Sequence, residues 1–411
     1  MAHHGPKNKL EFHALFYSVL STAFLFFLHH LPLNQLFIDP FSEAIKNHDI
    51  MDVALSKFRD HKDPKLFDDE VFIINSGITD RKAIAKTLEI LHSKGASVIG
   101  LDLLFDEKQD AEMDSILKAQ LSDKRTILGY TFEENINHYS VLSLNSDPYF
   151  TKNVSKAYVN LGTNDGFSVR TFEPVHSIDK EKDTAFAVKL VAYKHPEIAE
   201  ALLKRNLKKE WINFRRKQVG SANGHYPVNS DEVNHYPSVF MEDFINNASS
   251  YDDDYFVNKI VLIGFMGENE KAYSMKDRYF TPLNEKYSGR SHPDMHGVLV
   301  HANIISMIQH ADYINEVSEV RLYIIAFLLF FINFLFFDRI VKKNLFFTVA
   351  TIRVIQIIQF ILLFSLCIYL MSVHSIKVGF VLIITAVILS FELYEFYHKR
   401  IQKKIDIVFF K

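Results

Sequence analysis

The sequence has almost no cysteine and no strong excess of either charge, and these absences exclude several classes of protein. Its 411 residues include a single cysteine, Cys367, so an intrachain disulfide and a thiolate metal site are both excluded. The formal net charge is only -3, and no basic stripe is interleaved with aromatic residues. The sequence therefore gives no indication of nucleic acid as a partner.

The motifs of several common enzyme classes are also missing. There is no Walker phosphate loop, no Gly-x-Ser-x-Gly nucleophile elbow, no dinucleotide-binding glycine pattern and no His-Glu-x-x-His zinc motif. We therefore predict a protein that is not an enzyme, with no cofactor and no resident metal.

Long apolar runs, in contrast, are present at both ends of the chain. Hydrophobic residues make up 48% of the sequence and charged residues 23%, more apolar material than one soluble core requires. Four runs have about the length that crosses a bilayer, and we place spans at residues 14–33, 321–337, 345–371 and 378–397. The sequence thus predicts a membrane protein with short tails at residues 1–13 and 398–411 and a large domain at residues 34–320.

The distribution of positive charge predicts the orientation. Basic residues gather in both tails and in the link "DRIVKKN", whereas the link "SVHSIK" is nearly neutral. Both tails should then face the cytoplasm, and residues 34–320 the periplasm or exterior. No small-x-small cleavage site follows the first run, which favours an uncleaved anchor. A cleaved signal sequence followed by three spans would leave the same domain outside.

Polar residues recur inside the last two spans. Arg353, Gln356 and Gln359 are spaced by three residues, and Glu392 and Glu395 lie at the same depth in the next span. A charge inside a membrane is costly unless it is paired, so we expect Arg353 to pair with Glu392 or Glu395. Extension of the Arg353 side chain to the cytoplasmic surface is an equally good interpretation, and a proton pathway is a weaker one.

The outward domain has the sequence pattern of an α/β fold. "EVFIINSG" and "ASVIGLDLLF" have the composition of buried strands, and "DRKAIAKTLEILHSKG" between them has the period of a helix. This order is typical of a βαβ unit with parallel strands. Further strands are predicted at "KRTILGYTF", "AYVNLG" and "KIVLIGFMG". We expect a mostly parallel sheet flanked by helices, with residues 183–216 helical and polar enough to lie on the surface.

Polar residues follow three of the predicted strands, at the ends where open α/β sheets bind ligands. The candidate ligand-binding residues at these ends are Asp102, Asp106, Asn160, Asp165, Arg170 and Asp277. Each carboxylate could instead be a helix cap or a solvated loop residue. Their oxygens would suit a divalent cation, although the spacing is not diagnostic. A metal-assisted hydrolase built on Asp102, Asp106 and Asp165 is the least favoured of the functions considered.

A cluster of histidines raises the question of a metal site. The four histidines between residues 291 and 310 are His292, His296, His301 and His310. Pro293 and Gly297 favour a loop around the first two. We expect a helix from about Val300, with His301 and Asn303 in its first turn, where free N–H groups favour polar side chains and anions. Only these two are retained as candidate ligand-binding residues, and no metal site is predicted.

The order of these segments closely resembles a known sensory family. "VFIINSG", "GASVIGLDLLF", "VNLGTNDGFSVR", "NKIVLIGFMG" and "HGVLVHANIISMI", followed by three spans, are similar to the second class of CHASE domain. The most specific residues of the resemblance are Gly95, Gly100, Asp102, Gly264, Thr281, Pro282, Gly297, His301, Ala302 and Asn303. The family is the extracytoplasmic sensory module of bacterial cyclases, histidine kinases and related receptors.

The resemblance implies a domain that detects an external signal and passes it through the spans. Two features depart from the family. Asn75, Ser76 and Gly77 stand where members often have an Ile-Asp-Glu-x-Ser pattern. About 14 residues follow the last span, too few for a catalytic domain. We therefore expect the signal to pass to a separate protein.

The leading hypothesis is a non-enzymatic sensor or signal-coupling protein of the bacterial cytoplasmic membrane. Its expected partners are membrane lipid, an extracytoplasmic ligand, a separate membrane or cytoplasmic protein and, as a further possibility, a second copy of the chain. The alternative is a structural or assembly subunit of a cell-envelope complex.

Overall fold

A computed structural model describes residues 6–31, 49–134, 140–163, 168–219, 231, 233–268, 274–285, 291–343 and 347–410. The chain divides into two compact units. The helical unit comprises Met1–Ala54 and Asn315–Lys411, and the α/β unit comprises Leu55–Ile314. Each unit is described by itself.

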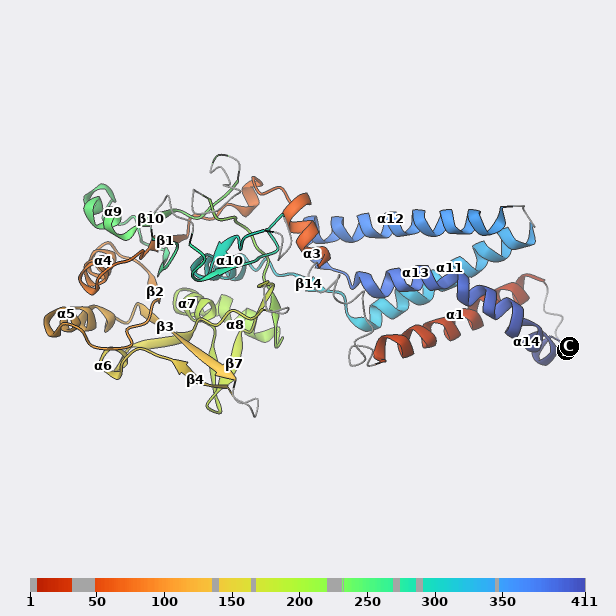
Figure 1. The fold of residues 1–411 in the computed structure, drawn as a ribbon, viewed down its shortest axis with the longest axis horizontal. Coiled ribbons are helices and arrows are strands. Elements are labelled where there is room, and N and C mark those ends of the chain that lie inside the picture. Colours follow the sequence, from red (N-terminus) through yellow and green to blue (C-terminus); the bar gives the residue numbers. More distant parts are fainter. Residues whose placement is uncertain are drawn as a thin grey trace. The chain divides into compact units, whose positions relative to one another are not determined.

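The α/β unit is built on a mostly parallel sheet (Figure 1). Its five neighbouring parallel strands are, in spatial order, β10 (Ser238–Phe240), β1 (Val71–Asn75), β11 (Ile260–Gly264), β2 (Val98–Asp102) and β3 (Thr126–Glu134). β5 (Ser155–Tyr158) pairs in parallel with β3. The sheet continues from β3 through three more strands, β4 (Ser140–Leu144), β7 (Val175–Ile178) and β8 (Glu181–Thr184).

Helices cover both faces of this sheet, which explains the uninterrupted apolar runs of the central strands. Every residue of β1 and β11 is buried. Phe72 and Ile74 belong to the core shared with α4 (Arg81–Ser93), α5 (Ala111–Leu121) and α9 (Met241–Asn246). The other face packs against α7 (Phe186–Lys194) and α10 (Gly297–Gln309), and α8 (Pro196–Lys204) contacts both of these helices. The predicted fold class is confirmed.

The prediction for residues 183–216 is wrong in two respects. α7 is buried against the sheet and the neighbouring α10, because its apolar residues fill that layer. The helices end at Lys204, and the chain from Glu210 is extended, with β9 (Glu210–Trp211) pairing with β6 (Thr171–Phe172). Arg215 and Arg216 are charged but do not lie on the surface. Both are buried and donate to main-chain oxygens.

The helical unit contains four helices that are long and apolar enough to cross a membrane, within the described ranges. Its helices are α1 (Pro6–His30), α3 (Ile50–Val53), α11 (Glu319–Lys342), α12 (Thr348–His374), α13 (Phe380–Phe396) and α14 (Gln402–Phe409). A π-helical turn, Tyr397–Ile401, joins α13 to α14. α11 packs against α1 and α13, and α13 packs against α12 (Figure 1). Two short strands, β14 (Asn315–Glu316) and β15 (Ile376–Lys377), pair in parallel.

Candidate functional site

Two of the predicted residues, Asp102 and Asp277, meet at the carboxyl ends of the central strands. Asp102 ends β2 and is paired in register with Gly264, which ends β11. The chain after β11 brings Asp277 to the start of α10, where a methyl group on Gly297 would lie 2.8 Å from Asp277 Oδ2. Only glycine leaves room for the carboxyl group there. Both aspartates are partly buried.

The electrostatics of this pair favour an added positive charge. Burial, and then the charge of Asp277, raise the pKa of Asp102 well above its ordinary value. Burial also raises the pKa of Asp277, although hydrogen bonds from the Tyr279 side chain and the Gly297 main chain oppose the shift. Within the described chain, the carboxyl group of Asp102 has no hydrogen bond or ion pair. The site can therefore take up a proton or hold the cationic group of a ligand.

Tyr279 is a member of this site that the sequence did not reveal. Its pKa is raised by burial and by the charges of Asp277 and Asp102, so it stays a neutral donor to Asp277. It lies two positions beyond Asp277 in the sequence, before Thr281 and Pro282. Alternation along β12 (Arg278–Tyr279) gave no signal, because the strand has only two residues.

The structure places two more of the predicted residues, Asp106 and Arg170. Asp106 is exposed on the loop after β2. Arg170 is buried, and its carbonyl oxygen accepts from the main chain of Ile212. Asp165 lies outside the described residues. Within the described part of the chain, no group of three or more His, Cys, Asp or Glu side chains is arranged to hold a metal ion.

Asn160 belongs to a different part of the sheet. Its amide accepts from the Phe132 N–H at 2.9 Å and donates to the Phe132 carbonyl at 2.8 Å, in the manner of a neighbouring strand. It also lines a cavity of about 310 Å³ beside β3 and β5. His176 stacks on Phe132 in the wall of this cavity, with ring centroids 4.4 Å apart. Asn160 thus lines a cavity whose lining residues include neither Asp102 nor Asp277.

The expected position of His301 and Asn303 is wrong. α10 begins at Gly297 instead of Val300, so both residues lie in its second turn and are buried. The helix starts early because the Gly297 N–H donates to the Asp277 carbonyl oxygen, which replaces a side-chain cap. Neither residue is placed to bind an anion at the helix start.

Asn303 instead holds an extended segment against α10. Its Oδ1 accepts from the N–H groups of Arg215 at 2.8 Å and Arg216 at 3.0 Å, and its Nδ2 donates to the Leu299 carbonyl. His301 packs edge to face on Phe186 of α7, and burial lowers its pKa to about 4. Both side chains therefore serve packing in this structure.

The other histidines also have local roles. His292 lies in a loop, as predicted, but His296 is buried in the short strand β13 (Met295–His296), which pairs with β12 directly before α10. Between them, Asp294 accepts from the Thr281 N–H at 2.9 Å and from its hydroxyl at 2.5 Å, and so joins the Thr-Pro turn to the start of α10. Burial raises the pKa of Asp294 to about 6.

In the helical unit, Arg353 lies beside Glu392 instead of Glu395. Arg353 Nη2 is 2.5 Å from Glu392 Oε1, and both side chains are about half exposed. Glu395 pairs with Lys399 on its own helical segment. Gln356, in contrast, is buried and donates to the Val387 carbonyl oxygen at 2.7 Å.

Comparison with known families supports the sensory resemblance. The sequence profile of the CHASE2 domain matches residues 65–336. The match extends beyond the α/β unit into α11. The resemblance predicted from the motifs is therefore confirmed. Comparisons with curated proteins and with solved structures found no match.

Proposed function

Because the chain belongs to the CHASE2 domain family, which is sensory and not catalytic, we propose that it is a non-enzymatic membrane sensor or signal-coupling protein. Its outward domain would bind a ligand, and its helices would pass the signal to a separate partner. The fold and the four candidate spans fit a membrane sensor. The ligand, the route and the partner are the proposed parts.

One observation carries the proposed route: Lys377 binds both segments that connect the helical unit to the α/β unit along the chain. Asp49 caps α3, the last helix before Leu55, and Glu316 lies in β14, directly after Ile314. Lys377 Nζ is 3.2 Å from Asp49 Oδ2 and 3.5 Å from Glu316 Oε1. A displacement of either connecting segment would therefore act on the same ammonium group.

Main-chain hydrogen bonds strengthen this junction. The N–H of Asn315 donates to the Ser375 carbonyl and the N–H of Val317 donates to the Lys377 carbonyl, each at 2.9 Å. Lys377 lies between the end of α12 and the start of α13. The turn between these two candidate spans is thus fixed to the segment that enters α11. A shift of β14 is proposed to change the arrangement of all three helices.

The ligand is proposed to bind at Asp102 and Asp277 through a cationic group. Asp277 contacts the first residue of α10, and α10 leads along the chain to Ile314 and β14. Charge binding at Asp277 would favour one position of α10 over another. This supplies the differential contact that a two-state sensor needs.

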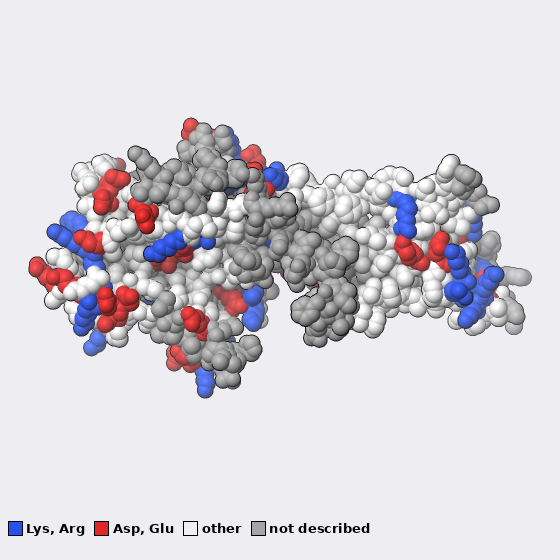
Figure 2. All heavy atoms as spheres, in the orientation of Figure 1, with Lys and Arg blue, Asp and Glu red and all other residues white. Residues whose placement is uncertain are grey.

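The orientation is proposed from the charges of the helical unit. Lys and Arg gather where α11 and α13 end, at Arg339, Lys342, Lys343, Lys399, Arg400, Lys403 and Lys404. In Figure 2, blue basic groups and red acidic groups lie together at one end of a mostly white stretch. By the positive-inside rule, that end and both termini would face the cytoplasm of a bacterium, and the α/β unit would lie outside.

The proposed partner site is α14. Ile405 packs into the helical core, whereas Ile407 and Val408 are exposed beside Lys403 and Lys404. A photo-crosslinker in place of Val408 should capture a membrane or cytoplasmic protein in cells. The same group at exposed Val349 on α12 is the control.

The route can be tested by hydrogen exchange on the full-length protein in a bilayer, with spermidine as the cationic probe. Wild type should show altered exchange at residues 315–317 and 375–377 when the probe binds. Lys377→Met should still bind spermidine but lose the response at 375–377. Spermidine binding that requires Asp102 and leaves both segments unchanged would contradict the proposed route.

A further inference from the structure

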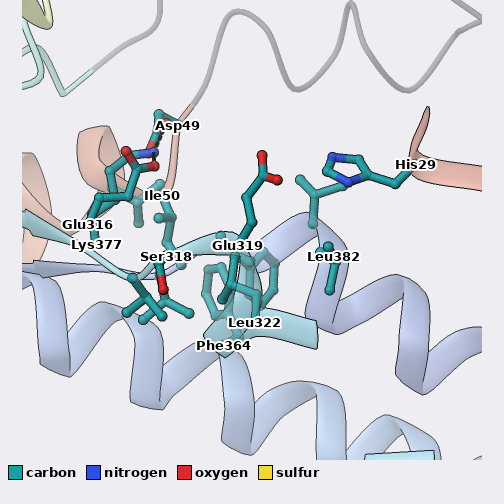
Figure 3. Close-up of a pocket in the computed structure, with 16 residues that line it drawn as sticks. His29, Asp49, Ile50, Glu316, Ser318, Glu319, Leu322, Phe364, Lys377 and Leu382 are labelled. Atoms are coloured by element: carbon teal, nitrogen blue, oxygen red, sulfur yellow. Dashed lines mark ion pairs between the residues drawn. The ribbon is translucent and has the colours of Figure 1, made fainter. Parts of the chain in front are cut away.

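The helical unit contains a cavity of about 740 Å³ beside the Lys377 junction (Figure 3). It lies where α11 and α13 begin and α12 ends. Its apolar lining includes Ile50, Val53, Leu322, Phe364, Val378 and Leu382. The volume is in the range of pockets that enclose most of a small ligand. An apolar cavity of this size at the ends of membrane helices is suited to a hydrocarbon chain.

The rim of the cavity is acidic. The described lining residues include three carboxylates, those of Asp49, Glu316 and Glu319, and one ammonium group, that of Lys377. Lys377 pairs with Asp49 and Glu316, while the carboxylate of Glu319 has no hydrogen bond or ion pair within the described chain. Figure 3 shows the Glu319 carboxyl group extended between Asp49 and His29. His29 is engaged by the Tyr323 hydroxyl at 2.7 Å. The carboxylate of Glu319 is therefore available to a cationic group of a ligand.

From this combination we infer that the cavity binds a membrane lipid whose head group carries an ammonium, of the phosphatidylethanolamine type. The chain enters between Leu322, Phe364 and Leu382, and the ammonium donates to Glu319. The lining helices are candidate spans, so their ends lie at the depth of lipid head groups. A lipid with an anionic head group would instead add negative charge beside three carboxylates.

This site goes beyond the proposed sensor function, because it lies wholly in the helical unit and does not require a ligand on the α/β unit. It also has a distinct readout, which is lipid retention instead of signal transfer. A lipid bound here would touch Glu316 and Lys377, the residues of the junction. If the sensor proposal fails, the lipid site still stands or falls by its own measurement.

The test is native mass spectrometry of the full-length protein after detergent exchange with chain-matched phosphatidylethanolamine or phosphatidylglycerol. Wild type should retain the ethanolamine lipid about tenfold better. Glu319→Gln should reduce that preference to about twofold or less, because the free carboxylate is lost. Glu395→Gln, which removes a carboxylate elsewhere on the helical unit, should leave it unchanged.

A second pair of variants tests the cavity itself. Val53→Phe should fill the space and lower retention of both lipids about tenfold. Val320→Phe makes the same change at an exposed position of α11 outside the lining and should behave as wild type. Equal retention of the two lipids by wild type would overturn the head-group assignment. Unchanged retention by folded Val53→Phe would overturn the site, and if that variant does not fold, Glu319→Gln decides alone.

Discussion

The carboxylates of Asp102 and Asp277 and those of Asp49 and Glu316 are each brought together from distant parts of the sequence. Within the described chain only the second pair forms ion pairs, whereas at the first pair the charge of Lys276 lowers the pKa of Asp277 less than burial raises it. Lys377 lies within 3.5 Å of both Asp49 and Glu316. At the first pair, Tyr279 supplies a neutral hydroxyl and the pKa of Asp102 is raised. A balanced pair fixes a structure, whereas an unbalanced pair has a cost that an external proton or cation can relieve.

Within the α/β unit, Asn303 is a buried polar side chain whose hydrogen-bonding groups are well matched by their partners. Its loss should lower the free energy of unfolding more than any other change considered. Asn303→Ala leaves the buried N–H groups of Arg215 and Arg216 without their acceptor. We expect the free energy of unfolding to fall by about 3 kcal/mol, because each buried unsatisfied donor is costly. Denaturant unfolding of the full-length protein measures this. Asn247→Ala, at an exposed amide, should cost less than about 1 kcal/mol.

The Lys377 junction should give the next largest effect. Lys377→Met removes the ammonium group that pairs with both Asp49 and Glu316, and we expect a loss of about 2 kcal/mol. The loss is smaller than for a fully buried pair because Glu316 is half exposed. Adding Glu316→Gln should restore part of the stability. No recovery in the double variant would show that Lys377 acts through packing instead of charge.

At the pair formed by Asp102 and Asp277, removal of a charge should raise the free energy of unfolding instead of lowering it. The pKa of Asp102 is higher in the folded than in the unfolded protein. The contribution of Asp102 to the free energy of unfolding is therefore highest below about pH 4 and is lost as pH rises through the folded pKa. Asp102→Asn cannot ionise and should be more stable than wild type at pH 8, by on the order of 1–2 kcal/mol, with little difference near pH 4.

Thermal unfolding at the two pH values checks this reversal. Asp106→Asn removes a nearby carboxylate that is exposed and should change stability by less than about 0.5 kcal/mol at either pH. A destabilised Asp102→Asn at pH 8 would mean that the carboxylate has a compensating partner, and the contrast with Lys377 would be lost.

The same contrast explains how far the sequence could lead. The buried parallel strands could be predicted from the sequence, because continuous apolar runs such as Val71–Asn75 follow from burial on both faces. The role of Asn303 could not be predicted, because its partner Arg215 lies 88 residues away. Asp102 and Asp277 were found as strand-end carboxylates, yet their mutual approach depends on the chain after β11 returning to α10. Lys377 is the one charge in a nearly neutral turn, and nothing in that turn indicates its distant partners Asp49 and Glu316.

The start of α10 shows the limit most directly. Sequence signals for a helix start are local side-chain caps, and none is used at Gly297. The acceptor for its N–H is the main-chain oxygen of Asp277, which any residue type would supply. No local sequence pattern predicts such a cap, so the start of α10 was predicted three residues too late.

Arg353 and Glu392 should show the smallest effect, although they are oppositely charged and close. Their side chains are 46% and 48% exposed, so solvent or head groups can replace either partner. Glu392→Gln should therefore change the midpoint of thermal unfolding in detergent by an amount equivalent to less than about 1 kcal/mol. Gln356→Leu, which removes one of two side-chain donors to the Val387 carbonyl oxygen and leaves only Ser390 Oγ, should cost at least as much. Glu392→Gln could instead lower the free energy of unfolding as much as Lys377→Met does. Solvent exposure would then not set the strength of these ion pairs, and the distinction between balanced and unbalanced carboxylates would have to rest on geometry alone.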